Sequence, residues 1–134
     1  MPEQGQLPKG FHTITPFLIA EEPRKLMDFI VRGLGGVVTM PPESDDHFHA
    51  EVRVGDSILM LARVVPPAYP AYKAELYLYV PNADALYKQA IAAGATSDEA
   101  PADRPWGDRM GAVRDCAGNR WMLATRKEDR RPAA

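Results

Sequence analysis

The chain has 134 residues, 46% of them hydrophobic, and its 16 basic and 18 acidic residues give a net charge of -2. This size suits one domain with one core, and the balanced charge argues against recruitment of nucleic acid or an anionic membrane surface. The single cysteine, Cys116, excludes an internal disulfide framework, and no apolar stretch approaches the ~20 residues of a membrane-spanning helix. Because the first ten residues also lack the apolar run of a signal peptide, we expect a cytoplasmic protein.

The first half of the chain predicts the order strand, helix and three strands. Apolar residues at helical spacing follow Pro23, which suits a first helical turn, and glycines end the helix. Strict alternation of apolar and polar residues then indicates a half-buried strand. The expected elements are a flexible arm over 1–10, a strand over 12–19, a helix over 23–34, and strands over 37–40, 47–54 and 57–63.

The second half predicts the same order after a proline-rich crossing segment over 64–72. Asn82 is a suitable N-cap for the second helix, which Gly94 closes. The Pro- and Asp-rich stretch before Gly107 predicts a strand that is short or irregular. The expected elements are a strand over 74–80, a helix from 83, this short strand, a hairpin over 113–125, and a flexible tail over 128–134.

The two halves are copies of one unit. Val52 to Arg63 and Val113 to Thr125 both run from Val-Arg through a glycine turn to Met-Leu-Ala, and Met122 follows Met60 by 122 − 60 = 62 residues. The helices repeat at a similar offset, since Leu86 follows Leu26 by 86 − 26 = 60 residues. A constant period indicates that one supersecondary unit is used twice.

Two such units resemble the vicinal oxygen chelate superfamily, which includes glyoxalase I, extradiol dioxygenases and bleomycin-sequestering proteins. Within it, the chain resembles the glyoxalase-like proteins labelled PhnB-like, through the segments 49–57, 76–80, 106–109 and 114–121. The resemblance implies an α+β fold in which two βαβββ modules form a curved mixed sheet around a concave cleft, with the helices outside. It also implies one domain over 11–127, with modules over 12–63 and 73–126, and pairing as a homodimer.

The resemblance places the family's metal ligands at Thr15, Met60, Glu75 and Met122. The repeat supports this placement, since 75 − 15 = 60 and 122 − 60 = 62. One carboxylate is not enough for a catalytic divalent ion, and thioether sulfur is a poor ligand for hard cations. We therefore expect no metal and no other cofactor. Two alternatives stay open: an unorthodox site of His47, His49 and Glu51 on one strand face, and a slip that puts His12 in place of Thr15.

The cleft-facing strand positions combine aromatic, thioether and charged side chains, which suits an irregular organic ligand. Three arginines among them are candidates for binding a carboxylate or phosphate. Glu75 is a tentative general acid or base, although a salt bridge to Arg53 or Arg114 would explain it equally well. The candidate ligand-binding residues are Phe17, His49, Arg53, Met60, Tyr77, Tyr79, Trp106, Arg114, Arg120 and Met122. The alternative role of these residues is to pack the cleft or a dimer contact.

Three functions follow, in order of preference. The first is binding of a small organic molecule in the cleft, without the usual metal, as bleomycin-type sequestering proteins do. The second is a divalent-metal-dependent lyase, isomerase or dioxygenase, and the third is a structural or regulatory dimer. The sequence contains no serine hydrolase pattern, phosphate-binding glycine loop or basic nucleic-acid stripe.

Overall fold

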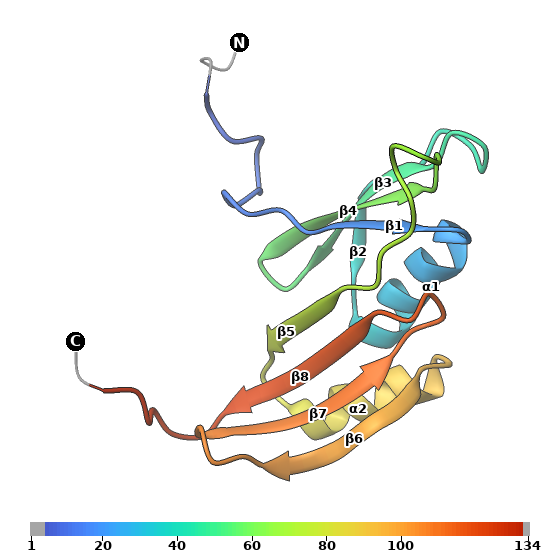
Figure 1. Ribbon diagram of the computed structural model, residues 1–134. Helices are drawn as coiled ribbons and strands as arrows, with labels where there is room; N and C mark the ends of the chain where they lie inside the picture. Colours follow the sequence, from blue (N-terminus) through green and yellow to red (C-terminus); the bar gives the residue numbers. More distant parts are fainter. Residues whose placement is uncertain (1–4, 133–134) are drawn as a thin grey trace.

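The computed structural model describes residues 5–132, which form two modules with the same order of elements (Figure 1). Each module consists of a strand, a helix and three more strands. The first contains β1 (Phe17–Ala20), α1 (Pro23–Leu34), β2 (Val37–Met40), β3 (His49–Val54) and β4 (Ser57–Arg63). The second contains β5 (Glu75–Tyr79), α2 (Ala83–Ala92), β6 (Thr96–Asp103), β7 (Asp108–Arg114) and β8 (Arg120–Arg126). The predicted duplication of one unit is confirmed.

Each module folds its four strands into one mixed sheet. The orders are β1-β4-β3-β2 and β5-β8-β7-β6, which are equivalent when the modules are matched. The first strand of each module runs parallel to the last, and the other neighbours are antiparallel. The sheets are curved and neither closes into a barrel, and the predicted α+β fold of two βαβββ modules is confirmed (Figure 1).

Both helices begin and end where local chemistry favours it. Pro23 occupies the first turn of α1, and Gly35 ends that helix in the left-handed conformation at φ 73° while its N–H donates to the carbonyl of Ile30. In α2 the side chain of Asn82 accepts a hydrogen bond from the Ala85 N–H at 3.0 Å. Neither helix is long and apolar enough to cross a membrane, among the residues that the structure describes.

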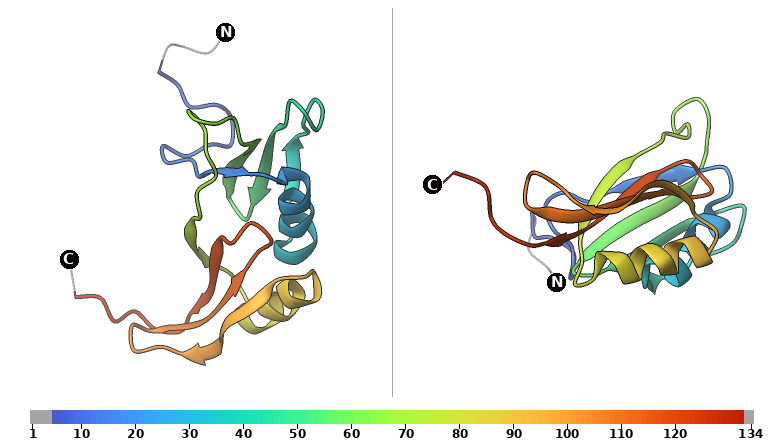
Figure 2. Two further views of the ribbon diagram at one scale, coloured as in Figure 1. Left: turned by 45° about the vertical axis from the view of Figure 1, so that its right-hand side comes forward. Right: turned by 90° about the horizontal axis from the view of Figure 1, so that it is seen from below.

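One core joins the two modules. The helices pack against each other on one side of the two sheets (Figure 2). Leu26, Ile30 and Leu61 of the first module and Trp121 and Leu123 of the second are all fully buried and belong to the same cluster. Burial of side chains this large stabilises the fold by about 1.5–3 kcal/mol each. The relative placement of the modules therefore rests on apolar packing beneath the sheets.

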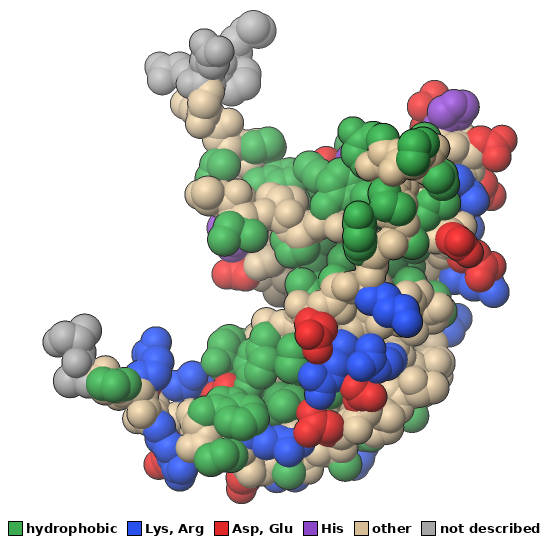
Figure 3. Space-filling view, in the orientation of Figure 1, with side chains coloured by type: hydrophobic (Ala, Val, Ile, Leu, Met, Phe, Trp, Pro, Cys, Tyr) green, Lys and Arg blue, Asp and Glu red, His purple; other side chains and the backbone are tan. Residues whose placement is uncertain are grey.

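Within residues 5–132, no helix covers the opposite faces of the two sheets. In the space-filling view the molecule is hollowed between its two halves, and hydrophobic side chains lie on both (Figure 3). Alternation along the strands explains this, since Leu18 of β1 is 3% exposed while its neighbour Phe17 is 46% exposed. We call this surface the concave face.

Three predicted boundaries need correction. β1 starts at Phe17 rather than at residue 12, because the preceding residues bend and Pro16 offers only its carbonyl, which accepts from the Met60 N–H. β3 starts at His49 rather than at residue 47. β7, the first strand of the predicted hairpin, starts at Asp108 rather than at residue 113. The prediction that β6 is short or irregular is confirmed in its second form, because this strand of 8 residues has register shifts against β7 on both sides of Glu99. The predicted flexible ends fall partly on residues 1–4 and 133–134, outside the described range.

Candidate functional site

The first half of the concave face is built from β1, β3 and β4. Phe17 is paired with Met60 in the β1–β4 register, and Glu51 is paired with Met60 from the other side. The rings of Phe17 and His49 meet edge to face, with centroids 5.9 Å apart. The structure thus brings together three predicted ligand-binding residues, Phe17, His49 and Met60, on one sheet.

A cavity of about 390 Å³ opens on this half. Its floor comes from β1, β3 and β4, and its walls come from the loop before β3 and from the segment after β4. The lining residues are Phe17, Ile19, Glu43, Asp46, His47, Phe48, His49, Ala62, Arg63, Val65 and Tyr69. Its volume falls in the range of sites for small organic molecules.

The second half of the concave face has an apolar floor under two tyrosines. Met110, Ala112 and Ala124 are buried and Met122 packs against them. Tyr77 stands beside Met122 in the β5–β8 register, and its ring centroid lies 5.4 Å from that of Tyr79. This half therefore holds Tyr77, Tyr79 and Met122 together, on a different sheet from Phe17 and His49.

A hydrogen-bonded chain ties Trp106 to this half. The Trp106 indole N–H donates to the Tyr77 hydroxyl at 2.9 Å, and that hydroxyl donates to Asp108 Oδ2 at 2.7 Å. The other carboxylate oxygen of Asp108 forms an ion pair with Nε of Arg126 at 2.7 Å, and Nη2 of Arg126 donates to the Tyr79 hydroxyl at 3.1 Å. Trp106 is 47% exposed and Asp108 only 1%, so a buried charge anchors an exposed indole.

The surroundings shift the acidity of both ends of this chain. Burial, followed by the hydrogen bond to Asp108, raises the pKa of Tyr77 to about 12. Burial acts to raise the pKa of Asp108, but hydrogen bonds from Tyr77 and Tyr79 and the charge of Arg126 outweigh it and hold that pKa below its usual value. At neutral pH the site therefore contains a neutral phenol that donates to a charged carboxylate.

Residues 127–130 donate hydrogen bonds to the loop that carries Trp106. The carbonyl of Gly107 accepts from the N–H groups of Lys127 and Glu128 at 2.9 and 3.1 Å. Arg130 donates to the Pro105 carbonyl at 3.0 Å. Gly107 adopts a φ of 101°, and a Cβ at this position would collide with the Glu128 carbonyl. The described part of the predicted tail thus contacts the Trp106 loop.

Arg120 lies in a network of acids at the other end of the second sheet. Its guanidinium contacts Glu99 at 2.6 Å, Asp98 at 2.8 Å and Glu75 at 3.3 Å. Asp98 also pairs with Arg114 at 3.3 Å. The partner of Glu75 is therefore Arg120, across the β5–β8 pair, rather than the expected Arg53 or Arg114. Because Arg114 and Arg120 both face carboxylates, neither presents an uncompensated positive charge to an anionic ligand.

Arg53 differs from these two arginines. It lies on β3 between Val37 and Ile58, its side chain is exposed, and the structure gives it no ion pair among residues 5–132. It stands on the same sheet face as His49 and Glu51, as the alternation predicts.

The four positions expected to hold a metal can be tested by the chemistry of their donors. Thr15 is half-buried and its hydroxyl is directed to the His12 carbonyl at 3.4 Å, while Glu75 is held by Arg120. With Met60 and Met122 completing the set, one paired carboxylate is the only anionic donor, which does not fit a divalent ion. Within residues 5–132, no three His, Cys, Asp or Glu side chains lie close enough together to hold a metal ion. His47, His49 and Glu51 therefore do not form the unorthodox metal site.

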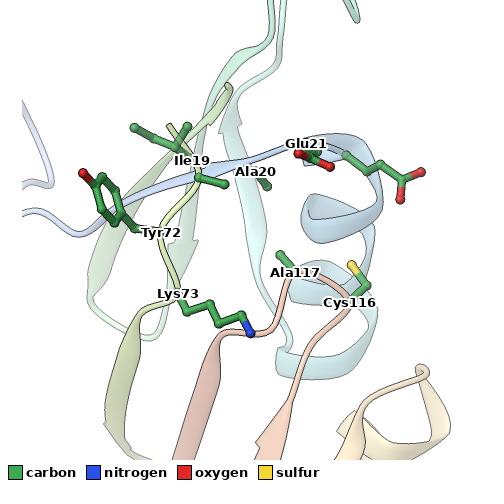
Figure 4. Close-up of a pocket in the computed structure, with 9 residues that line it drawn as sticks. Ile19, Ala20, Glu21, Tyr72, Lys73, Cys116 and Ala117 are labelled. Carbon is green, nitrogen blue, oxygen red and sulfur yellow. The ribbon is translucent and has the colours of Figure 1, made fainter. Parts of the chain in front are cut away.

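A second cavity, of about 260 Å³, lies where the two modules meet (Figure 4). Lys73 and Tyr72 from the crossing segment, Glu21 and Glu22 before α1, and Cys116 in the β7–β8 turn line it. Burial and the neighbouring Asp115 raise the pKa of the Cys116 thiol, which disfavours the reactive thiolate. This cavity therefore gives no support for a nucleophilic cysteine.

With this geometry in place, comparison with known proteins decides the family. Residues 11–123 match the sequence profile described as Glyoxalase/Bleomycin resistance protein/Dioxygenase superfamily. The chain belongs to this superfamily. The match covers both modules, so the glyoxalase-like fold, and not only a part of it, is assigned.

Three relatives within the glyoxalase/bleomycin resistance superfamily share between 21% and 28% identity with the chain. The uncharacterized protein Rv0887c of Mycobacterium tuberculosis is 28% identical over 122 residues, which cover 82% of this chain and 72% of that protein. The crystal structure of TioX from Micromonospora sp. ML1 has a TM-score of 0.74 at 25% identity, over 86% of this chain and 98% of that one. TnmS3 from Streptomyces sp. CB03234, described as an antibiotic binding protein, has a TM-score of 0.67 at 21% identity, over 86% and 97%.

Sequence reasoning missed two parts of this glyoxalase-like site. Asp108 enters the prediction only as part of the segment 106–109, although a carboxylate two residues after Trp106 at a strand start is the available signal. Glu43 and Asp46 belong to no predicted element, since they lie between the strands predicted over 37–40 and 47–54. Their position on a cavity depends on how the loop before β3 folds back over β1, which no local pattern records.

Proposed function

We propose that this glyoxalase-like protein binds a small organic molecule on its concave face and does so without a metal ion. On the segments 49–57, 76–80, 106–109 and 114–121 we also propose that it is a PhnB-like member of the superfamily, and that it is cytoplasmic. The observation that carries the proposal is the aromatic and thioether surface beside the 390 Å³ cavity, where Phe17, His49 and Met60 lie together. Such surfaces suit flat or irregular ligands, because aromatic faces and flexible thioethers adapt to many shapes.

Two further observations support binding over catalysis. The donor set at Thr15, Met60, Glu75 and Met122 lacks the several nitrogen or oxygen ligands that a Lewis-acid ion needs. TnmS3, described as an antibiotic binding protein, has this fold, and the likeness at 21% identity is one of fold alone. Glu75 remains the proposed acid or base if a reaction does occur, although its pairing with Arg120 at 3.3 Å favours a structural role.

We also propose that two copies of the chain associate. The concave face lacks a covering layer, and Ile14 and Tyr72 are 85% and 73% exposed. Burying such side chains against a second copy would be favourable by the hydrophobic effect. Light scattering should then give a mass near twice the 14.8 kDa of one chain, and a mass of one chain at micromolar concentration would contradict the proposal.

Ligand binding is tested by NMR titration with a set of planar organic molecules, in the presence and absence of EDTA. We expect binding that EDTA does not change and that Ala62→Trp weakens by roughly tenfold or more, because the indole fills the cavity floor. Ala92→Trp, on the exposed side of α2, is the matched control and should leave binding unchanged.

Elemental analysis of the purified protein separates the alternatives. Stoichiometric Mn, Ni, Zn or Fe, together with a turnover that needs the ion, would favour the divalent-metal enzyme instead. Absence of any ligand binding in the titrations, with an intact dimer, would favour the structural or regulatory dimer.

A further inference from the structure

The lining of the cavity on the first half of the concave face contains an apolar set and an acidic set of side chains. Phe17, Ile19 and Ala62 come from β1 and β4, and Val65 and Tyr69 follow β4 in the crossing segment. Phe17 and Tyr69 are 46% and 56% exposed, so both rings are available to a planar group. This apolar set provides the surface on which an aromatic ring would rest.

The acidic set consists of two carboxylates from the loop before β3. Glu43 and Asp46 both line the cavity and both are exposed. Neither makes an ion pair with any residue in the range 5–132, in contrast to their neighbour Asp45, which pairs with Arg24 at 2.7 Å. Two acidic side chains therefore face the cavity without a counter-charge of their own.

The cations in the lining do not cancel this charge. Arg63 donates from Nε to the Asp45 carbonyl at 2.6 Å and from Nη1 to the Glu21 carbonyl at 3.2 Å, so its guanidinium is used by the backbone. The other basic side chains in the lining are those of His47 and His49. With both histidines neutral, two carboxylates and one guanidinium leave the lining with a formal charge of -1.

Arginines elsewhere on the concave face are already neutralised. Arg120 faces three carboxylates, and Arg114 and Arg126 face Asp98 and Asp108. The expectation that arginines would bind a carboxylate or phosphate ligand therefore rests on Arg53 alone. The uncompensated charge at the cavity is negative.

We propose that the ligand of this cavity is a planar organic cation, whose ring lies against Phe17 and Tyr69 and whose ammonium or amidinium group faces Glu43 and Asp46. This inference rests on the proposed binding function and specifies the chemical class of the ligand. Aromatic faces attract cations as well as rings, so the apolar and the acidic set of lining residues favour the same molecule. Partial exposure keeps the contribution of each carboxylate modest and sensitive to salt.

The test uses three probes that share one ring system, namely naphthylmethylammonium, naphthylmethanol and naphthoate, each titrated into the full chain and followed by NMR. We expect the ammonium to bind most tightly and naphthoate most weakly. The double variant Glu43→Gln/Asp46→Asn should weaken binding of the ammonium by about threefold to tenfold and leave naphthylmethanol unchanged, because two partly exposed ion pairs are lost. Asp28→Asn, at an exposed position of α1, is the control and should have no effect.

The outcomes separate this inference from the proposed function. Equal binding of all three probes, or an ammonium affinity that the double variant does not change, would overturn the charge preference while binding itself stands. Tighter binding of naphthoate would overturn it in favour of an anionic ligand. If no probe shifts resonances of the cavity-lining residues, both the inference and the proposed function fail.

Discussion

Tyr77→Phe tests whether the Trp106 loop is anchored through the buried carboxylate. The substitution removes one hydroxyl that accepts from Trp106 at 2.9 Å and donates to Asp108 at 2.7 Å. Trp106 is exposed, so water can replace its partner at little cost, whereas Asp108 is 1% exposed and keeps only Arg126 at 2.7 Å and its neighbour Tyr79. A hydrogen bond to a charged group contributes about 1.5–3 kcal/mol, so we expect a loss of about 2 kcal/mol in the free energy of unfolding at pH 7.

The measurement is a pair of urea denaturation series at neutral and acidic pH, with Tyr79→Phe as the matched control. The Tyr79 hydroxyl is on the same strand and accepts from Arg126 at 3.1 Å, but the residue is 60% exposed, so its loss should cost about 0.5 kcal/mol. The pKa of Asp108 is lowered in the folded state, so its stabilisation is present above the unfolded value and is lost as the pH falls below about 4. The gap between wild type and Tyr77→Phe should therefore shrink near pH 3. Equal costs for the two phenylalanine variants, or a gap that does not change with pH, would refute the anchoring role.

Three other predictions concern the same half of the protein. Because the pKa of Tyr77 is raised to about 12, an absorbance titration should contain a late ionisation step that Tyr77→Phe removes. The matching stability should be present below pH 10 and decline as the pH rises through the folded value; a titration curve that Tyr77→Phe leaves unchanged at high pH would contradict it. Asp115→Asn should lower the free energy of unfolding by about 3 kcal/mol in a denaturant melt. One oxygen of Asp115 accepts from the N–H groups of Ala117 and Asn119 and the other accepts from Asn119 Nδ2 and Trp121 Nε1, so the NH₂ group of an asparagine would meet two donors in either orientation. A cost no larger than that of the exposed Asp46→Asn would argue against this prediction. Gly107→Ala should release the chain end from the Trp106 loop and shift the Trp106 fluorescence. The control is Gly55→Ala, which is also at positive φ but has open space for a Cβ and should leave the emission unchanged. An equal spectrum for both variants would count against the contact between Gly107 and Glu128.

Local patterns predicted most of the fold because each module is specified by short-range chemistry. Pro23 and Gly35 bound α1 as expected, and Asn82 caps α2. Alternation along β3 placed Ala50 and Val52 in the core and His49 and Arg53 on the opposite face. The prediction failed at residues 12–16, where Pro16 makes pairing depend on the neighbouring strand rather than on the segment itself.

The candidate site was predicted only in part. Periodicity identified which strand residues face away from the helices, and Phe17, Met60, Tyr77 and Met122 do share that face in pairs. It did not identify their partners. Arg120 is separated from Glu75 by 45 positions and from Glu99 by 21, and both distances in sequence exceed what a local pattern can relate.

The sequence by itself determined the repeated unit, the residues of the core and the side of each strand that faces away from it, because strand alternation and helical spacing are properties of neighbouring residues. Only the tertiary structure decided which charges cancel. Arg114 and Arg120 are neutralised by acids of β6, whereas Glu43 and Asp46 are left facing a cavity, and this distribution follows from how distant segments pack together rather than from their composition.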